Sequence, residues 1–286
     1  MTRGWVNWRP AEYWTVVIRE AVILAVKRKG GRRGGASPLQ LKYLHDQLSV
    51  EDDFEDVFDF CPDLSTIFLD NPDHKVLKML DKFEHLRKLK FNKVTFEHLI
   101  DTVKLLRKQI TMIETVASHG TLDLGLLSEH CPNLQTLEIY YSKKVISKSP
   151  VKFDKLTRCV IYCTDLSGEA ASDILERSPN IQHLNLSSAS SLSPASLQRT
   201  VNSGLLNNIT ELALMSAPLL DISSLELLVE NLPELRLVGR LEGWNVTSRA
   251  VEEFRRRIRK ENYDVTLWFN LPMHLELDFD EDLLGL

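Results

Sequence analysis

The stretch that decides the fold is Cys131-Pro132-Asn133-Leu134-Gln135-Thr136-Leu137-Glu138-Ile139-Tyr140-Tyr141. Its core is Leu134-x-x-Leu137-x-Ile139, and Cys131-Pro132 stands immediately before it. A short apolar run that follows a proline is typical of a buried strand after a turn. One such run says little about a fold, so its recurrence elsewhere in the chain is what matters.

The same spacing of apolar residues recurs along most of the chain. Its first position falls at Leu64, Leu86, Ile110, Leu134, Leu156, Ile181, Ile209 and Leu235, with the copies at Ile110 and Leu235 degenerate. Successive copies begin 22 to 28 residues apart. Self-similarity at such a period indicates a solenoid of stacked units. Leu39 is interpreted as the start of a partial first repeat, and Val265-x-Leu267-x-Phe269 as a closing strand.

Between the strands the apolar period changes from that of a strand to that of a helix. Helical faces are predicted at Phe96, Leu99, Ile100, Val103 and Leu106, at Leu225, Leu228, Val229 and Leu232, and at Val251, Phe254 and Ile258. Ser223-x-x-Glu226 fits a capping box, and Ser193-Pro194 fits a cap followed by proline at the first helical position. Each unit is therefore expected to contain one strand and one helix.

Units of this kind cannot bury their apolar faces alone, so they stack side by side. Strands pack about 4.8 Å apart whereas helices need about 10 Å, which curves the array with the sheet inside. We expect an α/β solenoid, with a parallel sheet on the concave face and helices on the convex face. The repeat domain is predicted to span residues 37–272 and to hold about eight to nine repeats.

The two ends of the chain differ from the repeats. Residues 1–36 are basic, with a charge of +6 over residues 1–35, while the remainder carries −11. A helix predicted around Trp14 to Ala25 has several interpretations: a cap on the first repeat, a poorly ordered end, a basic amphipathic helix on an anionic membrane, or a nuclear-import signal. Residues 273–286 are an acidic tail, interpreted as a mobile end or a segment folded over the concave face.

The repeated motif carries a family resemblance. Cys-Pro-Asn-Leu-x-x-Leu-x-Ile, preceded by a helix and repeated near 25 residues, resembles the cysteine-containing leucine-rich repeats of F-box/LRR proteins, over roughly residues 37–270. The resemblance implies a leucine-rich-repeat solenoid that holds a substrate protein. In that family an F-box docks on a Skp-type adaptor of a cullin ubiquitin ligase. Residues 1–36 are too short and of the wrong character for an F-box, so either it is missing from this chain or the protein is a repeat-only relative.

The motifs in the sequence favour a non-enzymatic protein. The chain has no phosphate-binding loop and no Gly-x-Ser-x-Gly elbow. Cys159 and Cys163 have no second pair or nearby histidine, which makes a zinc site improbable. No catalytic residue, metal ligand or cofactor-binding residue is therefore predicted. A net charge of −5 gives no general attraction for nucleic acid, and no run reaches the roughly 18 apolar residues of a membrane span.

Function is therefore expected on the concave face of the sheet. In each strand the residues between the apolar positions should project there, and aromatic and arginine side chains contribute most to interfaces. The predicted partner-binding residues are Phe68, Lys88, Lys90, Met112, Glu138, Tyr140, Arg158, Tyr162, His183 and Met215. Tyr140, Arg158 and Tyr162 form their centre, and the aromatic side chains are expected to be exposed there, as exposed aromatics on adjacent strands usually mark an interface. The alternative is that the tail or a loop between helix and strand covers them.

These observations predict a protein-recognition module that resembles the substrate-binding repeats of an SCF-type E3 ubiquitin ligase receptor. Its expected partners are a protein substrate or ligand on the concave face and, from the resemblance, a Skp-type adaptor and a cullin. The alternative is a leucine-rich-repeat scaffold or inhibitor unrelated to ubiquitination. The cysteines suggest buried thiols in a reducing compartment, so a cytoplasmic or nuclear location is expected.

Overall fold

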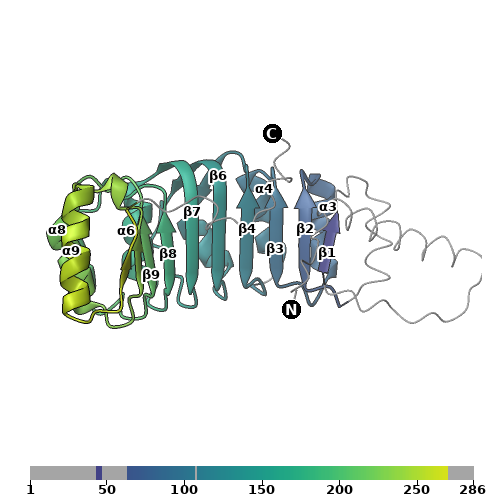
Figure 1. The fold of residues 1–286 in the computed structure, drawn as a ribbon. Coiled ribbons are helices and arrows are strands. Elements are labelled where there is room, and N and C mark those ends of the chain that lie inside the picture. The colour runs from purple at the N-terminus through teal and green to yellow at the C-terminus, as the bar shows by residue number, and fades with distance from the viewer. Residues whose placement is uncertain (1–42, 47–62, 107, 270–286) are drawn as a thin grey trace, which may run out of the picture.

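The computed structural model describes residues 43–46, 63–106 and 108–269. Across these residues a parallel sheet extends from end to end, and helices cover one of its faces (Figure 1). Neighbouring strands follow chain order, except that the short β5 pairs with the far half of β6. The strands are β1 (Tyr43–Asp46), β2 (Thr66–Asp70), β3 (Lys88–Asn92), β4 (Met112–Val116), β5 (Thr121–Asp123), β6 (Thr136–Ile146), β7 (Arg158–Leu166), β8 (His183–Leu186), β9 (Glu211–Leu214), β10 (Leu237–Gly239) and β11 (Thr266–Leu267).

The predicted repeats are confirmed by the strands. Each of the eight repeats contributes a strand that begins two residues after its first apolar position, as Thr136 follows Leu134. The closing strand predicted at Val265 is β11. Leu39 lies outside the described residues, but β1 pairs Tyr43 with Thr66, an offset of 23 residues. This pairing fits a partial first repeat before Leu64, but the residues where that repeat would begin are not among those described.

Helices follow the strands on the covered face of the sheet. They are α3 (His74–Lys78), α4 (Phe96–Leu105), α5 (Leu124–His130), α6 (Gly168–Arg177), α7 (Pro194–Asn202), α8 (Ile222–Asn231) and α9 (Ser248–Lys260), with 3₁₀ turns η1 (Met79–Lys82) and η2 (Leu241–Gly243). The helical faces predicted from Phe96, Leu225 and Val251 are confirmed as buried faces of α4, α8 and α9. Ser193 caps α7 with Pro194 at its start, as predicted.

The predicted capping box of α8 is wrong. Asp221, rather than Ser223, is the N-cap, and its carboxylate accepts from the Ser224 backbone N–H at 3.1 Å. Ser224 closes the box with its own side chain on the Asp221 backbone N–H. The helix thus begins at Ile222, which places Ser223 inside the first turn.

One continuous apolar core lies between the sheet and the helices. Leu134, Leu137 and Ile139 of the fold-deciding stretch are buried in it, together with Cys131. Burial raises the pKa of the Cys131 thiol to about 12. Burial of this kind supplies most of the favourable free energy of folding. These four residues therefore belong to the core of the fold.

The residue before the first leucine of several repeats connects adjacent repeats. The side-chain amides of Asn133, Asn180 and Asn208 each donate to a backbone carbonyl of the preceding repeat, at 2.8, 2.6 and 3.1 Å. Backbone amides do the same two or three residues further on, as Gln135 N–H donates to the Thr111 carbonyl at 2.8 Å. These three asparagines thus satisfy carbonyls in the turns that enter β4, β7 and β8.

The ends of several strands share a left-handed backbone residue. Asn71, Lys93 and Ala117 have φ values of 44°, 58° and 51°, although none is glycine. Their N–H groups donate to Asn92, Val116 and Tyr140 carbonyls in the following repeat, at 2.8, 2.8 and 2.9 Å. Each turn stores backbone strain that the hydrogen bond to the next repeat offsets.

The sheet is open, and its strands turn from face-on at β2 to nearly edge-on at β9 in Figure 1. The fold is the predicted α/β leucine-rich-repeat solenoid, with one sheet face under the helices. The opposite face, which was predicted to be concave, is called the open face below. The leader, residues 1–36, and the tail, residues 273–286, lie outside the described residues.

Candidate binding surface on the open face

Side chains on the open face form rows that cross the strands, because neighbouring parallel strands are in register. One row contains Lys88, Met112, Thr136, Arg158, His183 and Glu211. The next contains Phe68, Lys90, Glu114, Glu138, Val160, Asn185 and Ala213. Side chains in such rows are about 5 Å apart, so they interact directly or with diagonal neighbours. The rows therefore determine which predicted residues meet.

A second apolar cluster lies on this face, separate from the main core. Val116, Tyr140 and Val160 are buried in it, and Ala117 and Tyr162 pack against them. The rings of Tyr140 and Tyr162 stack with centroids 5.8 Å apart and planes 17° apart. Two aromatic rings in this geometry interact favourably beyond their buried area. The centre of the open face is therefore apolar across β4, β6 and β7.

Two ion pairs lie beside this cluster. Lys90 Nζ lies 2.6 Å from Glu114 Oε2, and Arg158 Nε donates to Glu138 Oε1 at 2.5 Å. The Tyr140 hydroxyl donates to the other Glu138 oxygen at 3.3 Å. Burial raises the pKa of Glu114, and the hydrogen bond and charge of Lys90 only partly offset that effect. The Arg158 side chain is 41% exposed, so its pair is worth no more than about 1 kcal/mol and leaves the side chain partly accessible.

A small hollow opens beside the second apolar cluster, over β7 to β10. Its volume is about 160 Å³, and its polar lining comes from Arg158, Tyr162, His183, Asn185 and Glu211. His183 Nδ1 lies 3.1 Å from Glu211 Oε2, and Asn185 Nδ2 donates to the Tyr162 hydroxyl at 2.6 Å. A hollow of this size holds one side chain of a partner rather than a cofactor.

The structure brings together half of the predicted binding residues. Glu138, Tyr140, Arg158, Tyr162 and His183 lie on three adjacent strands and contact one another or the same hollow. The remaining residues lie apart from them: Phe68 is on β2, Lys88 and Lys90 on β3, Met112 on β4, and Met215 follows β9. The predicted centre of Tyr140, Arg158 and Tyr162 is therefore one contiguous group.

The expectation that the aromatic residues of this set are exposed is wrong for two of them. Tyr140 is 3% exposed and Phe68 is 8% exposed, and Glu138 is buried as well. Tyr140 stacks on the Tyr162 ring and packs against the valines of the second cluster. The accessible members near the centre are Arg158, Tyr162 and His183, all half-buried.

Sequence reasoning missed several residues of this surface. Glu114, Asn185 and Glu211 project to the open face as the alternation predicts, but nothing in their residue type singles them out. Their importance comes from partners 23 to 28 residues away, such as Lys90 for Glu114 and His183 for Glu211. The register between strands was the signal that could have found them.

The described residues show no arrangement suited to metal or membrane chemistry. Within ranges 43–46, 63–106 and 108–269, no group of three or more His, Cys, Asp or Glu could hold a metal ion. In the same ranges no helix is both long and apolar enough to span a bilayer. Cys159 lies in the core, where burial raises the pKa of its thiol to about 12.

Comparison with known proteins adds little about function. No family of known proteins matches the sequence, and no curated protein matches it. Among solved structures, a chain in the crystal structure of the Rad7 and Elc1 complex from yeast is similar, with 13% sequence identity and a TM-score of 0.48. The similarity covers 90% of this chain and 82% of that chain. A likeness at this level supports no inference about partners.

Proposed function

We propose that this protein is a non-enzymatic recognition module that holds a protein partner on the open face of its sheet. The observation that carries the proposal is the second apolar cluster, which lies outside the main core and is bordered by ion pairs and a hollow. Apolar centres with polar rims are the usual anatomy of protein interfaces. Arg158, Tyr162 and His183 form the accessible part of that rim.

The chemistry of the described cysteines supports a binding role over catalysis. A nucleophilic cysteine needs a lowered pKa, whereas burial raises the pKa of both Cys131 and Cys159. The pKa of Cys163 is raised too, again mainly by burial. His183, which lines the hollow, lies against Glu211, and no serine, cysteine, threonine or lysine is among the residues that line that hollow.

For the partner class, we propose the substrate of an SCF-type ubiquitin ligase, with a Skp-type adaptor and a cullin in the same complex. The support is the resemblance of the Cys-Pro-Asn-Leu motif to cysteine-containing leucine-rich repeats. A cytoplasmic or nuclear location belongs to the same proposal. The alternative, a repeat scaffold or inhibitor unrelated to ubiquitination, shares the open face as its binding surface and differs in the adaptor.

The open-face proposal is tested with the double variant His183→Ala/Glu211→Ala. Removing both partners of the pair leaves neither charge unmatched, and at 35% and 51% exposure of their side chains the pair contributes little to stability. The matched control is Asp101→Ala/Lys104→Ala, an exposed ion pair on α4, on the covered side. Partners are captured by cross-linked affinity purification of the full chain, and the affinity of each recovered partner is then measured.

We expect the double variant to bind the partner at least roughly tenfold more weakly, with an unchanged melting temperature, and the control to bind normally. Equal binding by both variants would show that the open face near β8 and β9 is not the interface. Recovery of a partner without a Skp-type adaptor or a cullin, under conditions where a known receptor retains both, would favour the scaffold alternative.

A further inference from the structure

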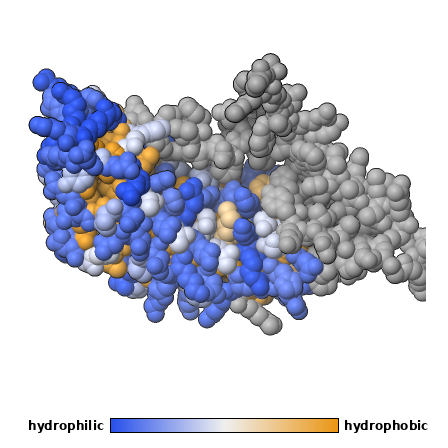
Figure 2. All heavy atoms as spheres, turned by 60° about the horizontal axis from the view of Figure 1, so that its bottom comes forward, coloured by the Kyte–Doolittle hydropathy of each residue, from blue (hydrophilic) through white to orange (hydrophobic). Residues whose placement is uncertain are grey.

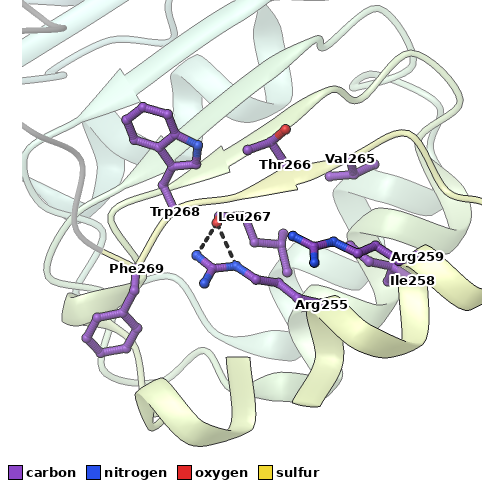
Figure 3. A pocket seen from close by; sticks show the side chains of 8 residues that line it. All are labelled: Arg255, Ile258, Arg259, Val265, Thr266, Leu267, Trp268 and Phe269. Carbon is purple, nitrogen blue, oxygen red and sulfur yellow. Dashed lines mark hydrogen bonds between the residues drawn. The ribbon is translucent and has the colours of Figure 1, made fainter. Parts of the chain in front are cut away.

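The C-terminal end of the solenoid carries a groove between β11 and α9 (Figure 3). Its volume is about 420 Å³, and Figure 2 shows hydrophobic surface at this end of the molecule, beside strongly hydrophilic surface. The Leu267 carbonyl there accepts from Arg255 Nε at 3.0 Å, and the Phe269 carbonyl accepts from the Glu242 N–H at 3.1 Å. An edge strand with its carbonyls occupied in this way is protected against pairing with another strand. A segment that another protein can reach lies instead between β6 and β7, in the middle of the solenoid.

The connection from β6 to β7 departs from the expected alternation of strand and helix. Residues 147–157, all of which the structure describes, contain no helix. Val151 and Phe153 are buried in the main core, while Pro150 and Lys152 are exposed. Alternate burial of this kind is that of an extended backbone. The connection therefore lies extended on the core and presents one row of side chains to solvent.

This connection contains the sequence Ser149-Pro150-Val151-Lys152, in which Ser149, Pro150 and Lys152 are exposed. Protein kinases bind the segment around the acceptor hydroxyl as an extended chain. A kinase pocket that offers no partner to the backbone N–H after the acceptor favours proline, because proline has no N–H to leave unsatisfied. A lysine three residues after the acceptor forms a charge-assisted hydrogen bond with a carboxylate of such a kinase. The segment therefore has the composition and the backbone form of a kinase substrate.

The other Ser-Pro pairs among the described residues lack these properties. Ser178 is fully buried, and Ser193 is the N-cap of α7, where its hydroxyl accepts from the Ser196 N–H. The third residues after these two serines, Ile181 and Ser196, are not basic. Phosphate transfer to either serine would require the core or the first turn of a helix to open. Ser149 alone of the three combines exposure with a following base.

We propose that Ser149 is the phosphate acceptor of a proline-directed protein kinase that has an acidic subsite for Lys152. In the transfer, the Ser149 hydroxyl oxygen bonds to the γ-phosphorus of ATP, the bond from that phosphorus to the bridging oxygen breaks, and ADP leaves. The hydroxyl proton passes to a base of the kinase. Both the kinase and ATP come from outside this chain. This inference does not depend on the function proposed above.

The contact of Ser149 with α5 gives the modification a consequence. A Cβ added to Gly125 would overlap the hydroxyl and carbonyl oxygens of Ser149, so these atoms lie directly against the first turn of the helix. A phosphoryl group on the hydroxyl has no room on that side. The bond from the Lys148 N–H to Asp123, which holds the segment there, joins exposed groups. Such bonds open at low free-energy cost, which gives a kinase access to the hydroxyl.

Charge acts in the same direction as this steric effect. The Lys148 N–H donates to Asp123 Oδ1 at 3.3 Å, and the Ser147 hydroxyl donates to Asp173 Oδ2 at 2.6 Å. Asp123 caps α5, and Asp173 lies on α6. A phosphate on Ser149 adds a charge of about −1.5 to −2 beside these two carboxylates, and like charges repel. Phosphorylation should therefore loosen the segment from both helices.

The site is tested by incubating the full chain with ATP and a purified cyclin-dependent kinase, followed by mass spectrometry of the phosphopeptides. We expect phosphate at Ser149, and at least roughly tenfold slower incorporation there in Lys152→Ala, which loses a charge-assisted hydrogen bond to the kinase. The matched control is Lys148→Ala, an exposed lysine before the acceptor, which should leave the rate near that of wild type. Both substitutions keep the backbone N–H groups that hold the segment.

The loosening is tested by hydrogen exchange of the chain with and without phosphate on Ser149. We expect the Lys148 and Lys152 amides to exchange at least about threefold faster after phosphorylation. Absence of phosphate at Ser149, equal incorporation at Ser178 or Ser193, or equal rates in the two lysine variants would overturn the site. Phosphorylation of Ser149 with unchanged exchange would overturn the loosening.

Discussion

Glu114 shows how single residues on the open face depend on distant neighbours. Its side chain is 6% exposed, on a face that the alternation of the sequence assigns to the solvent side. Lys90, one strand away, is its ion-pair partner, while Glu138 on the other side acts against its charge. A carboxylate in this position pays a desolvation cost that a surface carboxylate avoids.

We predict that Glu114 makes the wild-type protein less stable as pH rises. Its folded-state pKa lies above 4.5, so its contribution is fully present below that value and is lost as pH rises through the folded pKa. The free energy of unfolding of wild type minus that of Glu114→Gln should therefore be larger at about pH 4 than at about pH 7. Urea denaturation at both pH values measures it.

The control for this prediction is Glu97→Gln on the exposed side of α4, which removes one carboxylate from the helix layer. The difference in the free energy of unfolding between wild type and Glu114→Gln should shrink as pH rises. A difference that stays constant or grows with pH would contradict the argument that burial raises the pKa of Glu114. The comparison between variants cancels the titration of all other groups, since these are common to each protein.

At the scale of elements, α8 illustrates what decides where a helix begins. Asp221 and Ser223 both precede the apolar face, and both residue types cap helices well. In the structure the carboxylate of Asp221 receives the Ser224 N–H, and the Ser223 hydroxyl donates to the same carboxylate at 2.6 Å. The turn after β9 thus directs the side chain of Asp221 back to the helix, and Asp221 is therefore the cap.

We predict that Asp221→Ala destabilises the protein by about 0.5–2 kcal/mol, because it removes the cap of α8. Ser223→Ala removes a hydroxyl that only orients the carboxylate, so it should cost less. The hydrogen bond from Ser223 is the main cause of the lowered pKa of Asp221, so the cap's contribution should fade as pH falls through that lowered value. Thermal or urea unfolding of both variants measures the difference. A larger loss of unfolding free energy in Ser223→Ala than in Asp221→Ala would favour Ser223 as the N-cap.

At the scale of the whole molecule, the solenoid is a row of units in which each contacts its neighbours. In such arrays the effect of a destabilising substitution depends on its position, since an end unit can unfold alone whereas a central unit cannot. Leu137 is fully buried in β6, at the middle of the sheet, and Leu267 is buried in β11, at its edge. The two leucines therefore form a matched pair for testing cooperativity.

We predict that Leu137→Ala lowers the global free energy of unfolding by about 2–5 kcal/mol, through lost burial and the cavity left behind. Leu267→Ala should mainly increase exchange of amides in β10, β11 and α9, with a smaller global effect. Hydrogen exchange resolved along the chain distinguishes the two patterns. Uniform loss of protection in both variants would show that the array unfolds as one unit.

The repeat architecture could be predicted almost entirely from sequence, whereas the surface could be predicted only in part. The apolar positions after Leu64, Leu134 and Leu235 mark their strands because a buried face must be filled in every repeat. Tyr140 was assigned to the correct face but with the wrong exposure.

By itself, then, the sequence determined the period, the strand-helix order and the face on which each strand residue lies. Those properties follow from local alternation and from the need to bury apolar side chains in every unit. Only the tertiary structure decided that Tyr140 stacks on Tyr162, that Glu114 pairs with Lys90, and that β11 leaves a groove at its free edge. These contacts join residues more than 20 positions apart or depend on which strand lacks a neighbour, and no local pattern encodes the lateral register that brings them together.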